Sequence, residues 1–342
     1  MSEIDGDIVA TAAELADVNL FPGALAVDAK GEVPTAALDL VCGAGFHGLF
    51  SPTEFGGLGA SPETQWAVLE ALAGGCLTTS FVWAQHAGPS RAAVETTGPM
   101  RDQWAEALAT GEARGGVAFA HLNRPGSPML QADPCSDGWL FSGTAPFVTG
   151  WDHIDVVLTA ARWADSIVWA MVDARDCETI TSRRLSLTAI DSAVTVELRF
   201  DKHPVATKAV TSVEQLKDWK ERYRRGLRSN GSNPLGVAAR AMRLLGPSLL
   251  DDQLSEARQQ IDAATADQLP EARARLGDLC VRATAALVAS IGGSALFVEH
   301  QAQRLAREAL FLLVQGQTPE IKRHHLERLT ASSLTQRLRN DG

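Results

Sequence analysis

The sequence has little of what marks secreted, zinc-binding or membrane-spanning proteins. Its five cysteines are scattered over 342 residues without any C-x-x-C spacing, so neither a disulfide framework nor a zinc site is expected. The first ten residues carry acidic and no basic side chains, which argues against a secretory signal. The longest strongly apolar uncharged run, 283–298, is shorter than the ~20 residues that a bilayer needs. We therefore expect a cytoplasmic protein.

Basic residues are also scarce relative to acidic ones. The chain has 31 Lys and Arg against 41 Asp and Glu, a formal charge of -10, which argues against nucleic acid or an anionic membrane as its main partner. With 45% hydrophobic and 21% charged residues, the composition is that of an ordinary soluble globular protein. The sequence contains neither an internal repeat nor a low-complexity tract.

The one long β-rich block lies between two helical regions. Apolar residues recur at helical spacing from 8 to 113 and again from about 209 to the C-terminus, whereas 115–200 is rich in strand formers. Helices, then strands, then helices indicate segregated layers and not alternating βαβ units. The sequence therefore predicts a mostly helical α+β fold, with an N-terminal helical domain at 1–113, a middle β domain at 114–208 and a C-terminal helical bundle at 209–342.

Several element ends are marked by proline and glycine. The strand from Val194 to Phe200 is expected to be an edge strand that Pro204 terminates. The glycine-rich segment 49–60 is interpreted as a turn between helices, because it lacks the preceding strand and the Gly-Lys-Ser/Thr of a phosphate-binding loop. Pro270 is expected to open a long helix, which Gly292 and Gly293 interrupt or end.

Four segments together resemble the acyl-CoA dehydrogenase superfamily of flavoproteins. Residues 51–59 resemble the family's Pro-Glu-x-aromatic-Gly-Gly-x-Gly turn, and 120–128 lie where the family has Thr-Glu-Pro-x-x-Gly-Ser-Asp. Residues 138–150 resemble the family strand that ends in aromatic-Ile/Val-Thr/Ser, and 292–323 follow its Gly-Gly to Gly-Thr-x-Glu-Ile-x-Arg segment without a gap. The four occur in family order and cover most of the chain.

The resemblance implies the same three-part fold, with a β-barrel-like middle domain, a C-terminal four-helix bundle, and FAD between these two near a subunit interface. It also implies self-association or a homologous partner subunit. Carried over by position, the implied cofactor contacts are Gly126 and Ser127 at the flavin pyrimidine or pyrophosphate, Phe147 as a wall of the ring, Thr149 near N5, and Thr318 and Glu320 near the adenine-ribose end.

The chain departs from the family where the chemistry occurs. Oxidation between the α and β carbons of a thioester needs a carboxylate that takes the α-proton. The family's usual Glu position is Gly316 here, and the alternative position at the start of the bundle aligns with Gly226, with no acid beside it. The family's Arg-x-x-Phe-Gly segment is not recognisable either. His121, in place of the family Thr, is a candidate acid or base, and Gly316→Glu is expected to restore the missing base.

Lys217 to Arg228 is unusually basic for an acidic chain. The segment is either a solvated helix face or a contact for the phosphates of a CoA ester, in which case Arg222, Arg225 and Arg228 would bind them. No metal site is expected.

Three functions are consistent with these observations. The first is an FAD-dependent oxidoreductase that acts on an acyl-CoA or carrier-bound acyl thioester with the standard base missing. The second is a reduced-flavin-dependent monooxygenase of the same fold, which needs no such Glu. The third is a non-catalytic subunit of a heteromeric acyl-CoA dehydrogenase. The electron acceptor and the substrate are not specified by the sequence.

Overall fold

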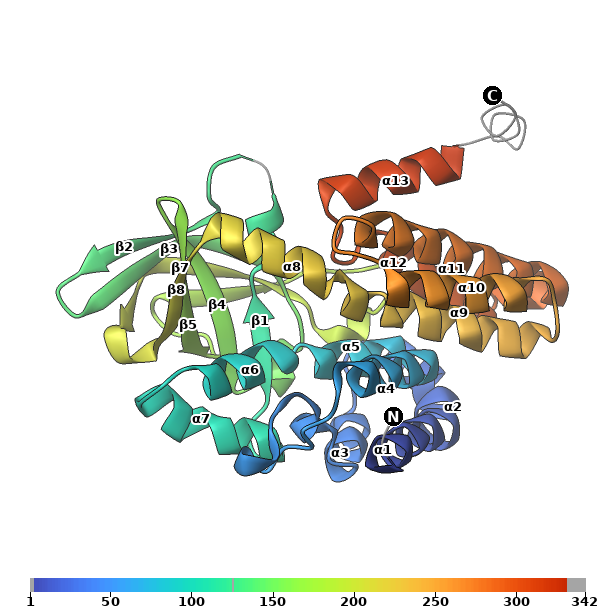
Figure 1. Ribbon diagram of the computed structural model, residues 1–342, viewed down its shortest axis with the longest axis horizontal. Coiled ribbons are helices and arrows are strands. Elements are labelled where there is room, and N and C mark those ends of the chain that lie inside the picture. Colours follow the sequence, from blue (N-terminus) through green and yellow to red (C-terminus); the bar gives the residue numbers. More distant parts are fainter. Residues whose placement is uncertain (1–2, 125, 331–342) are drawn as a thin grey trace. The chain divides into compact units, whose positions relative to one another are not determined.

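The computed structural model describes residues 3–124 and 126–330, which form two compact units, Met1–Glu221 and Arg222–Gly342. The N-terminal helical region and the β block share the first unit, and the second unit is helical (Figure 1). The mostly helical α+β class is thereby confirmed. The division at 113 and 208 stays a prediction.

The first unit begins with a helical layer. Glu3–Glu14 (α1), a π-helical stretch Leu15–Leu20 and Phe21–Lys30 (α2) run on from one another, and α1 and the π-helical stretch pack on α4. By length and composition, residues 4–30 are apolar enough to cross a membrane, and 28% of the apolar window is buried in this structure. The remaining helices are α3 (Thr35–Gly43), α4 (Pro62–Gly75), α5 (Leu77–Ala84), α6 (Ala87–Glu95) and α7 (Pro99–Thr110).

The glycine-rich segment 49–60 is a turn, as expected. It contains a 3-10 turn at Thr53–Phe55 between α3 and α4. Gly57 is required there, because a Cβ on it would lie 2.1 Å from the carbonyl oxygen of Ser51. The close backbone approach thus explains the glycine without a phosphate ligand.

Two buried histidines join this layer to the first strand. The Nδ1 of His86 accepts a hydrogen bond from the Gly115 amide at 3.0 Å, and its Nε2 donates to the Leu108 carbonyl at 2.8 Å. The His47 ring packs edge-on against it, with 4.8 Å between centroids. Burial lowers the pKa of His86 to about 4, so the ring is neutral at pH 7 and serves as a hydrogen-bond bridge.

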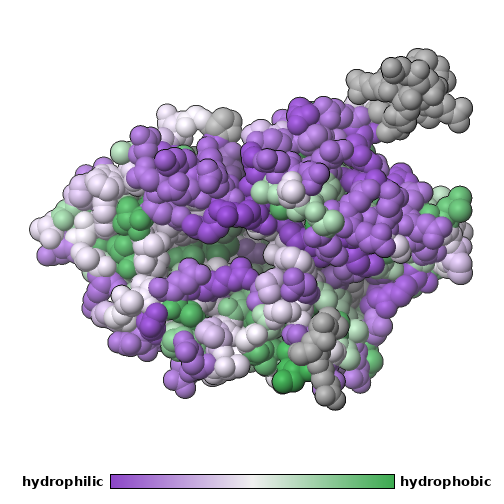
Figure 2. All heavy atoms as spheres, in the orientation of Figure 1, coloured by the Kyte–Doolittle hydropathy of each residue, from purple (hydrophilic) through white to green (hydrophobic). Residues whose placement is uncertain are grey.

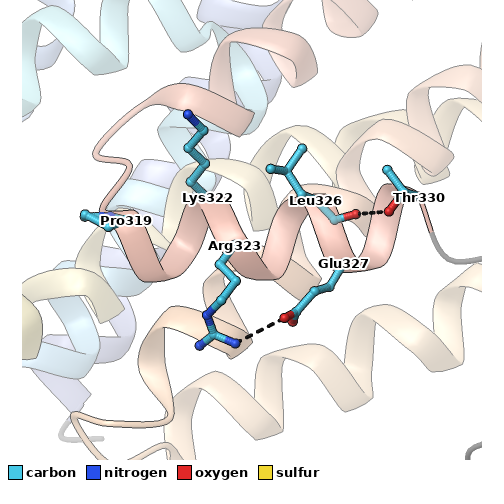
Figure 3. A pocket seen from close by; sticks show the side chains of 6 residues that line it. All are labelled: Pro319, Lys322, Arg323, Leu326, Glu327 and Thr330. Carbon is cyan, nitrogen blue, oxygen red and sulfur yellow. Dashed lines mark hydrogen bonds and ion pairs between the residues drawn. The ribbon is translucent and has the colours of Figure 1, made fainter.

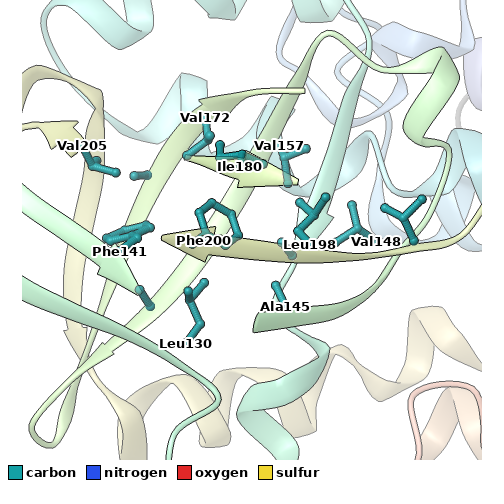
Figure 4. Close-up of a cluster of buried hydrophobic side chains, with 14 of the residues drawn as sticks. Leu130, Phe141, Ala145, Val148, Val157, Val172, Ile180, Leu198, Phe200 and Val205 are labelled. Atoms are coloured by element: carbon teal, nitrogen blue, oxygen red, sulfur yellow. The ribbon is translucent and has the colours of Figure 1, made fainter. Parts of the chain in front are cut away.

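The strands form one eight-stranded sheet with the order β6-β7-β3-β2-β4-β5-β8, and β1 pairs parallel to β4. Its buried face holds Phe141, Leu198 and Phe200 in a continuous apolar core (Figure 4). The strands are β1 (Gly115–Ala118), β2 (Leu130–Cys135), β3 (Gly138–Val148), β4 (Val156–Trp163), β5 (Ser166–Asp173), β6 (Ile180–Arg184), β7 (Val196–Ala206) and β8 (Val210–Gln215).

The expected edge strand is wrong in two respects. β7 lies between β6 and β3, and it continues past Pro204, which pairs with Leu140, as far as Ala206. The pairing with β6 ends at Phe200. Beyond that residue β7 pairs only with β3, and a strand with one partner is a position at which proline is tolerated.

The second unit is a helical bundle. α8 (Leu216–Asn230) leads into it, and α9, α10 and α12 pack around the long central helix α11, with α13 on its outside. Pro270 opens α11 and Gly292 ends it, as predicted. The helices are α9 (Ser232–Leu245), α10 (Leu250–Ala263), α11 (Leu269–Ile291), α12 (Gln301–Val314) and α13 (Pro319–Thr330).

One end of this bundle is apolar on its surface. The α9–α10 and α11–α12 connections share this end because successive helices alternate in direction, and Figure 2 shows hydrophobic surface there. Burial of such side chains is normally favourable. The large exposed apolar residues of the two connections are Leu249, Leu296, Phe297 and Val298.

Candidate functional site

Phe147 has an unusual backbone at the end of β3. The register between β3 and β7 jumps between Ala145 and Val148, and Phe147 in this bulge has a φ of 61°. Its ring is 45% exposed, and the guanidinium carbon of Arg124 lies 5.4 Å from the ring centre. A bulge of this kind redirects one side chain out of the strand pattern. The fold therefore presents an aromatic face to the surface at the position that the resemblance assigns to the flavin wall.

Thr149, two residues on, faces inward. It is 4% exposed, and its hydroxyl lies 3.1 Å from the hydroxyl of Thr195, which is equally buried. The amide of Gly150 donates to the carbonyl of Ala193 at 2.8 Å, which fixes the turn after the strand. A hydroxyl has one donor and two acceptor positions, so this pair retains capacity for a further polar atom.

Gly126 and Ser127 lie in the exposed loop before β2. Gly126 has a φ of 102°, and no atom lies within 4 Å of where its Cβ would be. Pro125 of the same motif is outside the described residues. Open space beside a glycine in this loop is compatible with close approach of a ligand.

His121 lies in the short 3-10 turn Ala120–Asn123 and is buried, with 4% exposure. Its Nε2 lies 2.9 Å from the carbonyl oxygen of Ala160, so this nitrogen donates. Its Nδ1 contacts no partner within the described part of the chain. Burial, above all, lowers the pKa of His121 to about 4, which makes the ring a poor proton acceptor at pH 7.

In the second unit, Gly316 forms the turn between α12 and α13. Its φ is 62°, and a Cβ on it would lie 2.8 Å from Nδ2 of Asn230 and 3.4 Å from the hydroxyl of Tyr223. Tyr223 donates to the Gly316 carbonyl at 3.4 Å. A glutamate here would adopt a strained φ and meet the Asn230 amide, and the expectation that Gly316→Glu restores a base stays a prediction.

Thr318 and Glu320 begin α13. The Thr318 hydroxyl accepts a hydrogen bond from the Ile321 amide at 3.3 Å, which is the geometry of an N-cap. Glu320 accepts from Arg224 at 3.3 Å. Its own helix-start amide and the Thr318 hydroxyl lower the pKa of the carboxyl, which is therefore ionised at pH 7.

The basic segment of α8 does not form one surface. Arg222 and Arg225 are exposed, whereas Arg228 is 8% exposed and bonds Asp262 at 2.6 Å. Arg224 is paired with Asp267 at 2.9 Å. Arg228 thus belongs to the inside of the bundle, because a buried guanidinium needs a paired carboxylate.

Two buried residues of this unit were not expected from the sequence. Arg273 on α11 is 1% exposed, and His325 on α13 is 3% exposed. Arg273 lies one turn before Leu276 and two turns before Cys280, both buried on the same helix. A positive charge within this apolar spacing is the signal that could have found it.

A shallow recess of about 430 Å³ follows one face of α13 (Figure 3). All of its lining residues come from this one helix, and Arg323 is paired with Glu327 at 3.2 Å. It encloses nothing from a second element. Within 3–124 and 126–330, no three His, Cys, Asp or Glu side chains lie together in a way that would hold a metal ion.

Comparison with known proteins gives the class of the chain. Residues 2–112 match the family model "Acyl-CoA dehydrogenase, N-terminal domain". No curated protein matches the chain in sequence.

Solved structures match almost the whole chain. Butyryl-CoA dehydrogenase from Megasphaera elsdenii has a TM-score of 0.81 at 16% identity, over 97% of this chain and 99% of its own. Glutaryl-CoA dehydrogenase from Mycobacterium smegmatis in complex with FADH2 has 0.81 at 15%, over 97% and 96%. Nitrososynthase from Micromonospora carbonacea var. africana has 0.79 at 18%, over 96% of each chain.

The chain therefore has an acyl-CoA dehydrogenase N-terminal domain and the acyl-CoA dehydrogenase fold along its length. The predicted resemblance is confirmed at this level. The fold is shared by a glutaryl-CoA dehydrogenase in complex with FADH2 and by a nitrososynthase, and a shared fold does not by itself assign an activity.

Proposed function

We propose that the chain is an FAD-dependent oxidoreductase that binds an acyl thioester, carried by CoA or by a carrier protein, and that it lacks the family's usual base. Two things support this: the fold shared with butyryl-CoA and glutaryl-CoA dehydrogenases, and the set of cofactor residues carried over by position. FAD when bound accepts the two electrons of the substrate. The rest of the proposal concerns what this chain's own residues do.

The observation that carries the flavin assignment is the conformation of Phe147. A non-glycine residue with positive φ costs about 1–3 kcal/mol and persists where the structure needs it. Here the strain holds an aromatic face outside the strand, two residues before the buried Thr149 and with Arg124, at the start of the Gly126–Ser127 loop, 5.4 Å from its ring centre. An aromatic plane, a hydroxyl and a loop that offers backbone N–H groups fit a flavin ring and its phosphates.

Thr318 and Glu320 fit the adenine-ribose end less directly. The Thr318 hydroxyl already caps α13, but the first amides of a helix also attract an anionic or polar ligand. Their assignment to FAD is part of the proposal.

The second part of the proposal is slow removal of the α-proton. A positioned base contributes ~10²- to 10⁴-fold to such a step. At Gly316 the chain has no carboxylate, and the Asn230 amide and the Tyr223 hydroxyl face the place where one would start. His121 is buried and its pKa is lowered to about 4. The chain should therefore oxidise simple saturated acyl-CoAs slowly.

The same absence favours a second candidate, a reduced-flavin-dependent monooxygenase. Oxygen chemistry on a reduced flavin does not need a carboxylate at position 316, and a nitrososynthase shares the fold. Oxygen-dependent product formation from supplied reduced flavin would favour this candidate over the first.

The flavin assignment is tested by replacing Phe147. Phe147→Gly should lower the stability of the apoprotein by no more than about 1–2 kcal/mol, because relief of the positive φ offsets part of the lost ring contacts and of the greater chain entropy of glycine. It should weaken FAD binding by about tenfold through loss of ring contact. FAD affinity is measured by flavin fluorescence quenching and stability by chemical denaturation. Trp163→Gly, also 43% exposed in the same sheet, is the control and should not weaken FAD binding. Unchanged FAD affinity in Phe147→Gly, or no flavin binding by wild type, would count against the assignment.

Catalysis is tested separately on the flavin-loaded protein without oxygen. Loss of flavin absorbance on adding butyryl-CoA reports dehydrogenation. We expect binding of the thioester, seen as a spectral perturbation, with slow bleaching. A protein whose flavin spectrum does not respond to any acyl thioester would refute the substrate class.

A further inference from the structure

Arg273 is a buried cation that forms no ion pair with a carboxylate of the described residues. Its Nη2 donates to Oε1 of Gln315 at 3.3 Å, and its Nε and Nη1 contact no acceptor in the described ranges. Burial lowers its pKa to about 10, which still leaves the guanidinium charged at pH 7. A buried charge of this kind is costly unless an anion or acceptor completes it.

The residue that Arg273 contacts, Gln315, directly precedes Gly316. A Cβ on Gly316 would lie 2.8 Å from Nδ2 of Asn230 and 3.4 Å from the Tyr223 hydroxyl. The guanidinium of Arg273 and the amide of Asn230 donate hydrogen bonds, whereas the Tyr223 hydroxyl already donates to the Gly316 carbonyl. Two donor groups therefore lie near the turn at which the resemblance puts a carboxylate of the protein.

His325 adds to the unsatisfied polar groups of this region. Both of its ring nitrogens lack partners among the described residues. Gly277 makes room for it, because a Cβ there would lie 2.4 Å from its Cε1. Burial and then the charge of Arg273 lower the pKa of His325 to about 4, so the ring is neutral and does not neutralise Arg273.

We propose that Arg273, together with the Asn230 amide, binds a carboxylate of the ligand at the Gly316 turn. A carboxylate satisfies a guanidinium and additional N–H or O–H donors at once, through charge-assisted hydrogen bonds. The proposal rests on the proposed function in one respect: the carboxylate is carried by the acyl chain of the thioester. A carboxylate of the ligand would thus occupy the region in which the resemblance puts a glutamate of the protein.

The first experiment needs no flavin. Formate is titrated into the full-length protein, and its affinity is measured by calorimetry and by the rise in melting temperature, with chloride at equal ionic strength as the reference. Wild type should bind formate at least about tenfold more tightly than Arg273→Met, since one charged hydrogen-bond partner is lost. Arg275→Met is the control, because Arg275 lies on the same helix but is paired with Glu256 at 2.8 Å, and it should bind formate like wild type.

Asn230→Ala covers the case in which Arg273→Met does not fold. It removes the side-chain amide, so formate affinity should fall by about three- to tenfold. No formate binding by wild type would overturn the proposal. So would Arg273→Met binding as tightly as wild type, or, if that variant does not fold, Asn230→Ala doing so.

The second experiment identifies the carrier of the carboxylate. Glutaryl-CoA and pentanoyl-CoA have acyl chains of equal length, but only the first ends in a carboxylate. Wild type should prefer glutaryl-CoA by about tenfold and Arg273→Met should lose this preference. Formate binding without that preference supports the anion site and refutes a carboxyl-ended thioester as its source. Formate affinity and the preference for glutaryl-CoA can both be measured on protein that binds no flavin. Failure of the proposed flavin-dependent function is therefore distinguishable from failure of the carboxylate site.

Discussion

Replacing Gly316 by alanine tests how the turn between α12 and α13 is held. The residue has a φ of 62°, where alanine costs about 1 kcal/mol more than glycine. The new Cβ would lie 2.8 Å from Nδ2 of Asn230. Because this amide is the end of a side chain that can rotate, we expect the contact to add about 1 kcal/mol. Gly316→Ala should therefore destabilise the protein by about 2 kcal/mol.

Two further variants separate the terms. Gly226→Ala replaces a glycine within α8 that has no atom within 4 Å of its Cβ side, so it should stabilise by about 0.5–1 kcal/mol. Asn230→Ala in the Gly316→Ala background should recover the contact term and leave the cost of the backbone. The assay is chemical denaturation followed by helical circular dichroism. Equal stability of Gly316→Ala and wild type, or no recovery with Asn230→Ala, would refute the geometry.

The same geometry predicts the behaviour of Gly316→Glu. The single variant should bleach bound flavin with butyryl-CoA little faster than wild type, because Asn230 opposes the new side chain. With Asn230→Ala added, the rate should rise, by up to ~10²- to 10⁴-fold if the carboxylate reaches the α-proton. A wild-type protein that already bleaches rapidly would show that another residue supplies the base.

Three other predictions concern the remainder of the chain. The free energy of unfolding should fall below pH 6.5, because the unfolded chain then binds protons that the buried His86 and His121, with pKa values of about 4, do not. Each histidine lowers the free energy of unfolding by about 1.4 kcal/mol per pH unit between pH 6.5 and 4. In His86→Gln the free energy of unfolding should depend less steeply on pH, which denaturation at several pH values tests. Removing the charges of exposed Arg222 and Arg225 should weaken CoA-ester binding at low salt if this solvated face binds phosphate, and calorimetry measures this affinity. Arg228→Met should lower stability by about 1–2 kcal/mol by breaking the ion pair with Asp262, and chemical denaturation measures this loss. The chain should self-associate, and Phe297→Asp, at a position 66% exposed, should shift it toward monomer in light scattering, with a monodisperse wild-type monomer as the opposing result.

Local patterns in the sequence were sufficient for most elements. Pro270 and Gly292 bound α11, because proline and glycine act on the backbone within a residue or two. The edge strand ending at Pro204 was wrong, since which neighbour a strand has on each side is decided by pairing with β3 and β6, far away in the chain.

Sequence alone determined the class of fold and the absence of a carboxylate at position 316, because both depend on residue type and order. Only the tertiary structure showed that Gly316 has a left-handed φ with Asn230 and Tyr223 beside it, that Arg228 is internal, and that Arg273 is buried next to Gln315. These facts depend on which distant side chains meet. A charged residue in a helical pattern has the same letter whether it faces solvent or the core, and its partners, not its type, decide its chemistry.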